Sequence, residues 1–207
     1  MKDIRTSTER VPRDVNLEAT GVQQLARRRI LSLGLGFAVA PCFAPLGEAA
    51  TPAMVNQTQY DAYSVMASYP EFSDWQGLLQ LSGLAPYARG PGPFTIFVPT
   101  NGAYYQYPMY YQTLVPNGVA MPNTTRLIAY VRMHVVLGLF PPTAFYGHKV
   151  VLRSVSMVPI TVDGTGPGTP TVTYSLLDGK TASAELSEAP IQASNGIIYP
   201  INNATIL

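Results

Sequence analysis

The chain has 207 residues, of which 47% are hydrophobic and 12% are charged, a length that suits one globular domain with a sizeable core and a short extension. Its formal net charge of +1 hides an asymmetry, because residues 51–207 carry only 6 basic and 7 acidic side chains. Without a basic field, the globular part lacks the electrostatic attraction that nucleic acids and anionic membranes require, which excludes both as expected partners.

The N-terminus has the layout of an export signal. Three arginines, Arg27–Arg29, come before an apolar run over residues 33–46, and small residues follow that run. This order of basic, apolar and small segments predicts a signal over residues 1–50. The paired arginines resemble a twin-arginine signal, with Ala26 in the place where that signal commonly has Ser or Thr.

The apolar run does not favour a permanent membrane span, because glycine and proline interrupt it and it is shorter than the ~20 residues that a span needs. We therefore predict cleavage near Ala49 or Ala50, with an uncleaved anchor as the alternative. Lipidation at Cys42 would need a small residue before the cysteine, and Pro41 disfavours it. Since Cys42 is the only cysteine, a cleaved chain would have no disulfide and no thiolate for a metal.

Residues 51–59 are predicted to be a flexible lead-in to a globular domain over residues 60–207. Residues 60–84 show helical spacing of apolar side chains that is interrupted near Pro70, which predicts two short helices. Trp75 comes just before the second of these helices and is expected to anchor the core.

A buried strand with turn chemistry comes next. Apolar character alternates over residues 94–98, and Pro99 is expected to end the strand. Either Thr100 or Asn101 is expected to cap the short helix that follows.

The second half of the domain is predicted to be mainly strands. The spacing of Leu127, Val131 and Val135 first predicts one more helix, over residues 124–136. Asn195-Gly196 predicts a tight turn into the last strand. Helices first and strands later indicate an α+β domain. Six strands are expected, over residues 149–152, 158–162, 171–176, 182–186, 190–193 and 197–201.

Three segments resemble the motifs of the fasciclin domain. Phe94–Tyr104 resembles its first signature box, Asn195–Leu207 resembles the second, and Tyr130–Gly138 resembles its Tyr-His-containing segment. The resemblance implies a single α+β domain with helices packed around a wedge-shaped β-sheet, and a secreted interaction module without catalytic activity. The residues that correspond to the structural residues of the family are Thr95, Phe97, Pro99, Thr100, His134, Asn195 and Gly196.

The chain also departs from the family pattern. Asn101 and Asn202 stand where the family commonly has Asp, and Tyr199 replaces the usual His. Asparagine can still bond the backbone at a turn, but the loss of two carboxylates makes a cation or ion-pair role at these positions doubtful.

No constellation of catalytic or metal-binding residues stands out. The two histidines, His134 and His148, lack a second ligand at helical spacing and a nearby pair of carboxylates. His134 is expected to be a buried, hydrogen-bonded core residue. Neither a Gly-x-Ser-x-Gly motif nor a phosphate-binding loop is present, so we predict no catalytic residue, no metal and no cofactor.

The most distinctive chemical feature is a tyrosine-rich segment over residues 104–111. Tyrosine combines a large apolar area with a hydroxyl at low conformational cost, which suits a contact surface. Alternatively, some of these side chains pack on the core, and Tyr104 is expected to do so. The predicted interaction residues are Tyr105, Tyr107, Tyr110 and Tyr111.

Taken together, these patterns and the family resemblance predict an exported, periplasmic or secreted protein of bacterial type that mediates protein–protein, cell-surface or extracellular-matrix adhesion. An alternative is the binding of an apolar small molecule, such as a carotenoid or another lipid, in an aromatic cleft near Pro108 and Met109. A hydrolase or metal enzyme is a third, weaker alternative.

Overall fold

The computed structural model describes residues 52–106, 108–115, 125–176 and 179–204, and the predicted export signal lies outside these residues. The helical elements are α1 (Ala62–Ala67), η1 (Pro70–Phe72), α2 (Ser73–Leu81), α3 (Ala85–Arg89), α4 (Asn101–Tyr105), α5 (Pro108–Leu114), α6 (Thr125–Met133) and η3 (Pro142–Ala144). The strands are β1 (Val55–Gln57), β2 (Phe94–Pro99), β3 (Val135–Leu137), β4 (Lys149–Arg153), β5 (Pro159–Asp163), β6 (Thr171–Ser175), β7 (Thr181–Glu185), β8 (Ile191–Ala193) and β9 (Gly196–Ile201).

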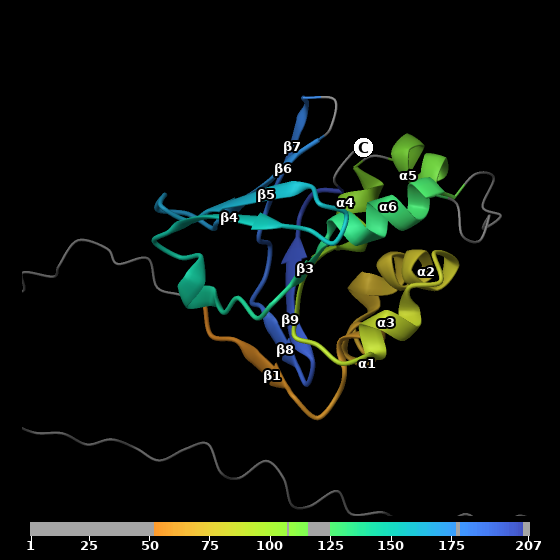
Figure 1. Ribbon diagram of the computed structural model, residues 1–207, viewed down its shortest axis with the longest axis horizontal. Coiled ribbons are helices and arrows are strands. Elements are labelled where there is room, and N and C mark those ends of the chain that lie inside the picture. Colours follow the sequence, from red (N-terminus) through yellow and green to blue (C-terminus); the bar gives the residue numbers. More distant parts are fainter. Residues whose placement is uncertain (1–51, 107, 116–124, 177–178, 205–207) are drawn as a thin grey trace, which may run out of the picture. The chain divides into compact units, whose positions relative to one another are not determined.

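The two segments that resemble signature boxes are neighbours in one mixed sheet, whose strand order is β1-β8-β9-β2-β3. Strands β2 and β9 run parallel, from the pair Phe94 and Gly196 to the pair Pro99 and Ile201. The other two neighbours of this central pair, β3 and β8, run antiparallel to it. Figure 1 shows β8 and β9 with helices α1 to α6 gathered on one side of them.

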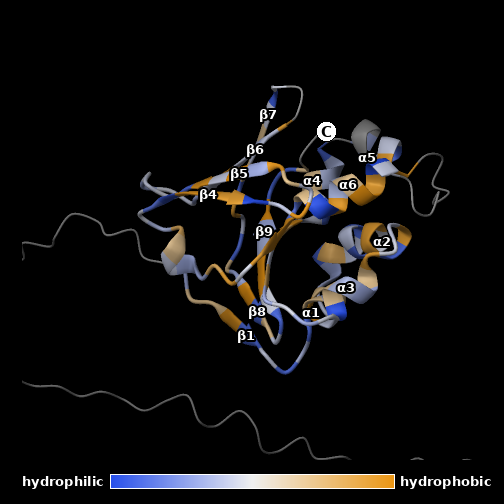
Figure 2. Cartoon of the chain, viewed as in Figure 1, coloured by the Kyte–Doolittle hydropathy of each residue, from blue (hydrophilic) through white to orange (hydrophobic). Residues whose placement is uncertain are grey.

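The central strands are buried on both faces, which explains their continuous apolar sequences. Every residue of β9 is buried, and only Phe94 of β2 is partly exposed. Figure 2 shows the hydrophobic colouring along β8 and β9. A strand that is covered on both sides cannot place polar side chains in water, and therefore reads as an apolar run rather than as an alternation.

The second sheet is an antiparallel meander in the order β4-β5-β6-β7. Buried and more exposed residues alternate along β5 and β6, as expected for a sheet with one face on the core. Two isolated bridges, between Val136 and Ser154 and between Leu186 and Ile201, connect the two sheets. Buried side chains from the helices and from both sheets form one hydrophobic cluster. The predicted α+β architecture is confirmed, and the six strands expected in the second half are present as β4 to β9.

Two strands differ from the expectations. Residues 55–57, within the predicted lead-in, form β1, which pairs in parallel with β8. The predicted helix over residues 124–136 ends at Met133, and Val135–Leu137 pairs with β2 as strand β3. A run of β-branched side chains such as Val135 and Val136 suits a strand as well as a helix, and the free edge of β2 decides between them.

The end of the first box also differs in detail. Thr100 lies at the N-cap position of α4, but its side chain makes no capping hydrogen bond. Asn101 instead serves the neighbouring helix α2, because its Oδ1 accepts a hydrogen bond from the backbone N–H of Asp74. Trp75 lies within α2 and is fully buried.

Candidate binding site

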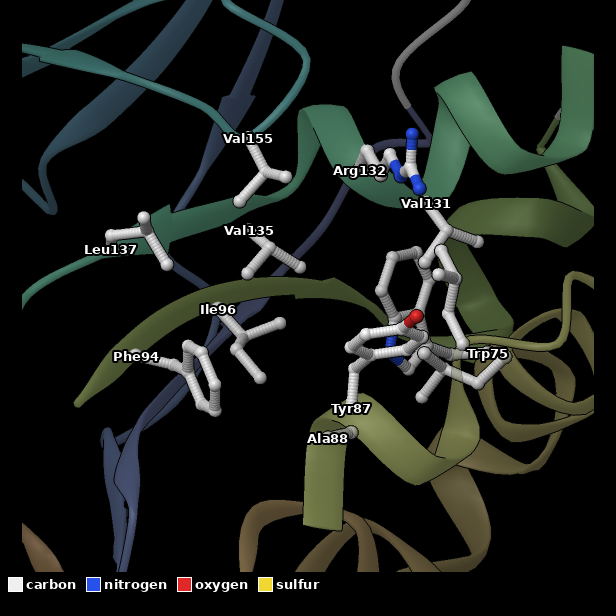
Figure 3. A pocket seen from close by; sticks show the side chains of 12 residues that line it. Trp75, Tyr87, Ala88, Phe94, Ile96, Val131, Arg132, Val135, Leu137 and Val155 are labelled. Carbon is white, nitrogen blue, oxygen red and sulfur yellow. The ribbon is translucent and has the colours of Figure 1, made fainter. Parts of the chain in front are cut away.

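A cavity of about 230 Å³ lies where the helices meet the edge of the mixed sheet. Figure 3 shows its lining, to which α2, α3, β2, α6, β3 and the turn after β4 contribute. The lining residues are Trp75, Leu79, Leu84, Tyr87, Ala88, Phe94, Ile96, Val131, Arg132, Val135, Leu137 and Val155.

Regular local structure positions these side chains. Trp75 and Leu79 lie four residues apart on α2 and therefore share one face of that helix. On the sheet, Phe94 is directly opposite Leu137, and Ile96 is directly opposite Val135, so these cross-strand pairs form one continuous wall.

The cavity is apolar inside and has exposed apolar side chains at its opening. Trp75, Ile96 and Val131 are buried, whereas 70% of Tyr87 and 66% of Leu137 is exposed to solvent. Val155 is held beside β3 because its N–H donates a hydrogen bond of 2.7 Å to the carbonyl oxygen of Val135. Exposed large apolar side chains that gather around a concavity are typical of binding surfaces. We call Tyr87, Leu137 and Val155 the apolar rim.

Arg132 is the one charged residue in this lining. It lies in the last turn of α6, and its side chain is exposed. Within the part of the chain that the structure describes, Arg132 has no ion-pair partner.

Behind Trp75 lies a fully buried histidine in an aromatic shell. The ring of His134 is 5.1 Å from Trp75, 4.7 Å from Tyr130 and 5.2 Å from Tyr174, measured between ring centroids. Its Nδ1 lies 2.9 Å from the carbonyl oxygen of Tyr130, which can only accept, so Nδ1 carries the proton and donates it. Burial lowers the pKa of His134 to about 4, and the imidazole is therefore neutral at pH 7.

The sequence pattern of the fasciclin domain matches residues 70–206. This chain belongs to the fasciclin domain family. Over 144 residues it is 30% identical to an uncharacterized protein of Synechocystis sp., and this match covers 69% of the chain and 95% of the Synechocystis protein. Its fold is similar to that of a fasciclin domain pair from the insect cell adhesion molecule Fasciclin I, with a TM-score of 0.56 and 14% identity. That match covers 72% of this chain and 52% of the two-domain structure.

The residues that correspond to the fasciclin boxes hold the elements together. Thr95 is buried, and its Oγ1 donates to the carbonyl oxygen of Gly138 while it accepts from the N–H of Phe140. Pro99 is the last residue of β2, and Phe97 stacks on Tyr199, with 5.7 Å between the ring centroids.

Asn195 connects the sheet to two helices. Its Oδ1 accepts a hydrogen bond of 2.8 Å from the N–H of Ala62 at the start of α1. Its Nδ2 donates to the carbonyl oxygens of Ala88 and Gly90, at 3.0 and 2.8 Å, at the end of α3. Its neighbour Gly196 begins β9, where a side chain would collide with the carbonyl oxygen of Phe94. The expected turn dipeptide is thus also the point where the helices are fastened to the central strands.

The departures from the family pattern have local explanations. The Nδ2 of Asn101 donates to the carbonyl oxygen of Pro70, and the Nδ2 of Asn202 lies 3.3 Å from a carboxylate oxygen of Glu185. An aspartate at either position could not donate these hydrogen bonds. The hydroxyl of Tyr199 donates to the carbonyl oxygen of Phe140 at 2.7 Å, and burial raises the pKa of Tyr199.

The predicted interaction tyrosines lie apart from the cavity, and none of the described ones lines it. Tyr105, on α4, is 75% exposed. Tyr111 is partly buried against Tyr104, with 5.2 Å between their ring centroids, and burial together with a hydrogen bond to Asp74 raises the pKa of Tyr111 to about 12. Tyr107 and the side chain of Tyr110 lie outside the described residues.

Sequence reasoning did not single out the cavity. Its walls come from Ile96, Val131 and similar apolar residues, which have the same pattern as ordinary core positions. The exposure of Leu137 follows from the position of β3 at the edge of the mixed sheet, and only the structure shows that position. Within the described ranges, no group of His, Cys, Asp or Glu is placed to hold a metal ion, and no helix has the length and apolarity of a membrane span.

Proposed function

We propose that this chain is an exported, non-catalytic protein that mediates adhesion by binding a protein or cell-envelope partner. The family to which it belongs is associated with adhesion, is generally non-catalytic and is typically extracellular. The observation that carries the proposal for this chain is the apolar rim of Tyr87, Leu137 and Val155 around an apolar cavity. Such a rim offers the desolvated contact on which protein interfaces depend.

A binding experiment with matched variants tests this proposal. Immobilised protein is incubated with cell-envelope fragments from the organism that makes it, and retention is measured. We expect the double variant Tyr87→Ser, Leu137→Ser to retain at least about tenfold less envelope material, because truncation of the few anchor residues of an interface weakens binding by more than about 1 kcal/mol each. Tyr60→Ser is the control, since Tyr60 is 51% exposed but does not line the cavity. Equal retention by all three proteins would contradict the assignment of the rim.

The tyrosine-rich segment is a second proposed contact region. Tyr105→Ser combined with Tyr110→Ser probes it, whereas Tyr111 is left in place because it packs on Tyr104 and bonds Asp74. If this variant retains less cell-envelope material and the rim variant does not, the partner contacts the tyrosine-rich segment and not the cavity.

Export is part of the proposal. Residues 1–50 are proposed to be a twin-arginine-type signal that delivers the protein to the periplasm or the cell exterior. Intact-mass measurement of the protein from its own cell envelope should give the mass of a chain that starts near residue 50 or 51. A full-length mass would mean that the segment is kept as an anchor.

A second candidate function is the binding of an apolar small molecule, and the cavity itself favours it. Pockets for small ligands are concave, mainly apolar and equipped with few polar groups, and this cavity has those properties. Organic extraction of the native protein, followed by mass spectrometry of the extract, tests for a resident ligand.

A further inference from the structure

We propose that the cavity binds a small amphipathic anion, whose apolar body fills the interior and whose carboxylate pairs with Arg132 at the edge. This inference rests on the second candidate function, because it requires the cavity to be a small-molecule site. It goes further by fixing the size, the charge and the orientation of the ligand.

The size of the cavity limits the apolar body. An apolar cavity of about 150 Å³ holds one benzene molecule. The 230 Å³ available here therefore suits a fused pair of rings or a medium-length alkyl chain. A carotenoid is far longer than this space, so the part of the ligand that fills the interior is much smaller than a carotenoid.

The lining requires the inner part of the ligand to be apolar. Ten of the twelve lining residues have apolar side chains, and Tyr87 and Arg132 are the exceptions. A polar group that leaves water without finding a hydrogen-bond partner loses about 2–7 kcal/mol, so a polar molecule would be rejected by the walls around Ile96 and Val131.

Arg132 is the reason to expect a negative charge on the ligand. Arg132 belongs to the lining, is exposed, and has no ion-pair partner among the described residues. A long basic side chain in this situation covers apolar surface with its stem and keeps its charged group in water. The planar guanidinium matches the geometry of a carboxylate, with which it can form two parallel hydrogen bonds. An anion at the edge of the cavity would therefore meet a free cation of suitable shape.

The test uses the purified exported chain and two matched pairs of probes. Decanoate is compared with 1-decanol, and 2-naphthoate with 2-naphthol, all below the concentrations at which they aggregate. Binding is followed by the fluorescence of Trp75, which lines the cavity and is the only tryptophan in the chain. The rise in melting temperature on ligand addition is the second readout, since a ligand that binds only the folded state stabilises it.

We expect each carboxylate to bind about fivefold more tightly than its neutral partner, the factor that corresponds to about 1 kcal/mol for a partly exposed ion pair. Arg132→Gln should abolish this preference. Arg126→Gln should keep it, because Arg126 lies on the same helix but does not line the cavity. Ala88→Leu should fill the cavity and weaken the binding of all four probes at least tenfold. If the Ala88→Leu protein does not fold, Val155→Phe, at the opening of the cavity, is used in its place. Whichever of decanoate and 2-naphthoate binds more tightly shows whether the site prefers an alkyl chain or fused rings.

Other outcomes of this experiment would contradict the proposal. Equal affinity for carboxylates and neutral probes, unchanged by Arg132→Gln, would overturn this inference and leave the apolar-ligand function standing. Binding that survives both Ala88→Leu and Val155→Phe would place the probes elsewhere and overturn the inference. No binding of any probe would overturn the inference and the second candidate function together. A short peptide with an apolar side chain next to a carboxylate is added as a fifth probe. If the peptide alone binds, the cavity belongs to a protein partner and the inference is overturned.

Discussion

At the scale of single residues, Asn195 shows how much one side chain can organise. Its amide makes three hydrogen bonds that connect the start of α1 and the end of α3 to the turn before β9. Asn195→Asp would turn the two donated bonds into contacts between a carboxylate and carbonyl oxygens. We expect the free energy of unfolding to fall by about 3 kcal/mol, the range for buried polar groups left unpaired.

Urea denaturation measures this loss, and Asn56→Asp is the matched control. The Oδ1 of exposed Asn56 only accepts a hydrogen bond, from the N–H of Thr58, and a carboxylate can still do so. Equal stability of the two variants would show that the amide of Asn195 does not fasten the helices.

His134 makes the stability of the domain depend on pH. Its pKa is about 4 in the folded protein against 6.5 in an unperturbed chain, because burial disfavours the charged ring. Below pH 6.5 the unfolded chain takes up a proton before the folded one, so the free energy of unfolding should fall as the pH drops from 6.5 to 4. The loss should reach about 3 kcal/mol, at 1.36 kcal/mol for each unit of pKa.

Chemical denaturation at several pH values between 4 and 7 tests this dependence. His134→Phe should remove most of the slope in that window, whereas His148→Gln, at an exposed position, should keep it. If His134→Phe follows the wild-type slope, another group is responsible.

At the scale of elements, the pairing of β2 with β9 depends on the absence of a side chain. A Cβ at Gly196 would collide with the backbone carbonyl of Phe94, whereas a Cβ at Gly77, within α2, would meet nothing within 4 Å. We expect Gly196→Ala to destabilise the domain by about 3 kcal/mol through overpacking. Gly77→Ala should stabilise it by up to about 1 kcal/mol, because alanine restricts the unfolded chain and suits a helix. Thermal melts of both variants would reveal the opposite signs, and two shifts of the same sign would contradict this account.

The elements themselves could largely be predicted from the sequence. The strands from Lys149 to Ile201 have clear apolar-polar alternation or β-branched runs between turn residues. Such local patterns predict strands that the structure contains. The failures lie where tertiary pairing decides the outcome. Residues 55–57 become a strand only because β8 has an open edge, and Val135–Leu137 leaves the helical pattern to pair with β2.

The candidate site could be predicted much less well than the elements. A tyrosine cluster is visible in a sequence, but a cavity is not, because it arises where side chains from separate elements fail to meet. Trp75 could be identified as a core anchor, yet nothing in the sequence shows that one side of its surroundings is open. The role of Arg132 depends on the same three-dimensional arrangement, since its spacing on α6 alone describes an ordinary exposed helix residue.

At the scale of the whole molecule, the helices and both sheets share one core. Buried residues such as Trp75 in α2, Ile160 in β5 and Ile198 in β9 belong to one cluster. We therefore expect the domain to unfold in a single cooperative step, in which the fluorescence of Trp75 and the far-ultraviolet circular dichroism change at the same urea concentration. A separate, earlier loss of the circular dichroism signal would mean that the sheet of β4 to β7 unfolds on its own.

The pairing of β2 with β9 also determines the order in which the protein can be made. Phe94 lies opposite Gly196, so the ribosome must add about a hundred residues after β2 before its parallel partner exists. During that interval the edge of β2 that later pairs with β9 is unpaired, and contacts between such distant segments are slow to form. The nascent chain is therefore a natural client for chaperones until β9 emerges, and any translocation machinery that accepts only folded cargo would have to wait for that last strand.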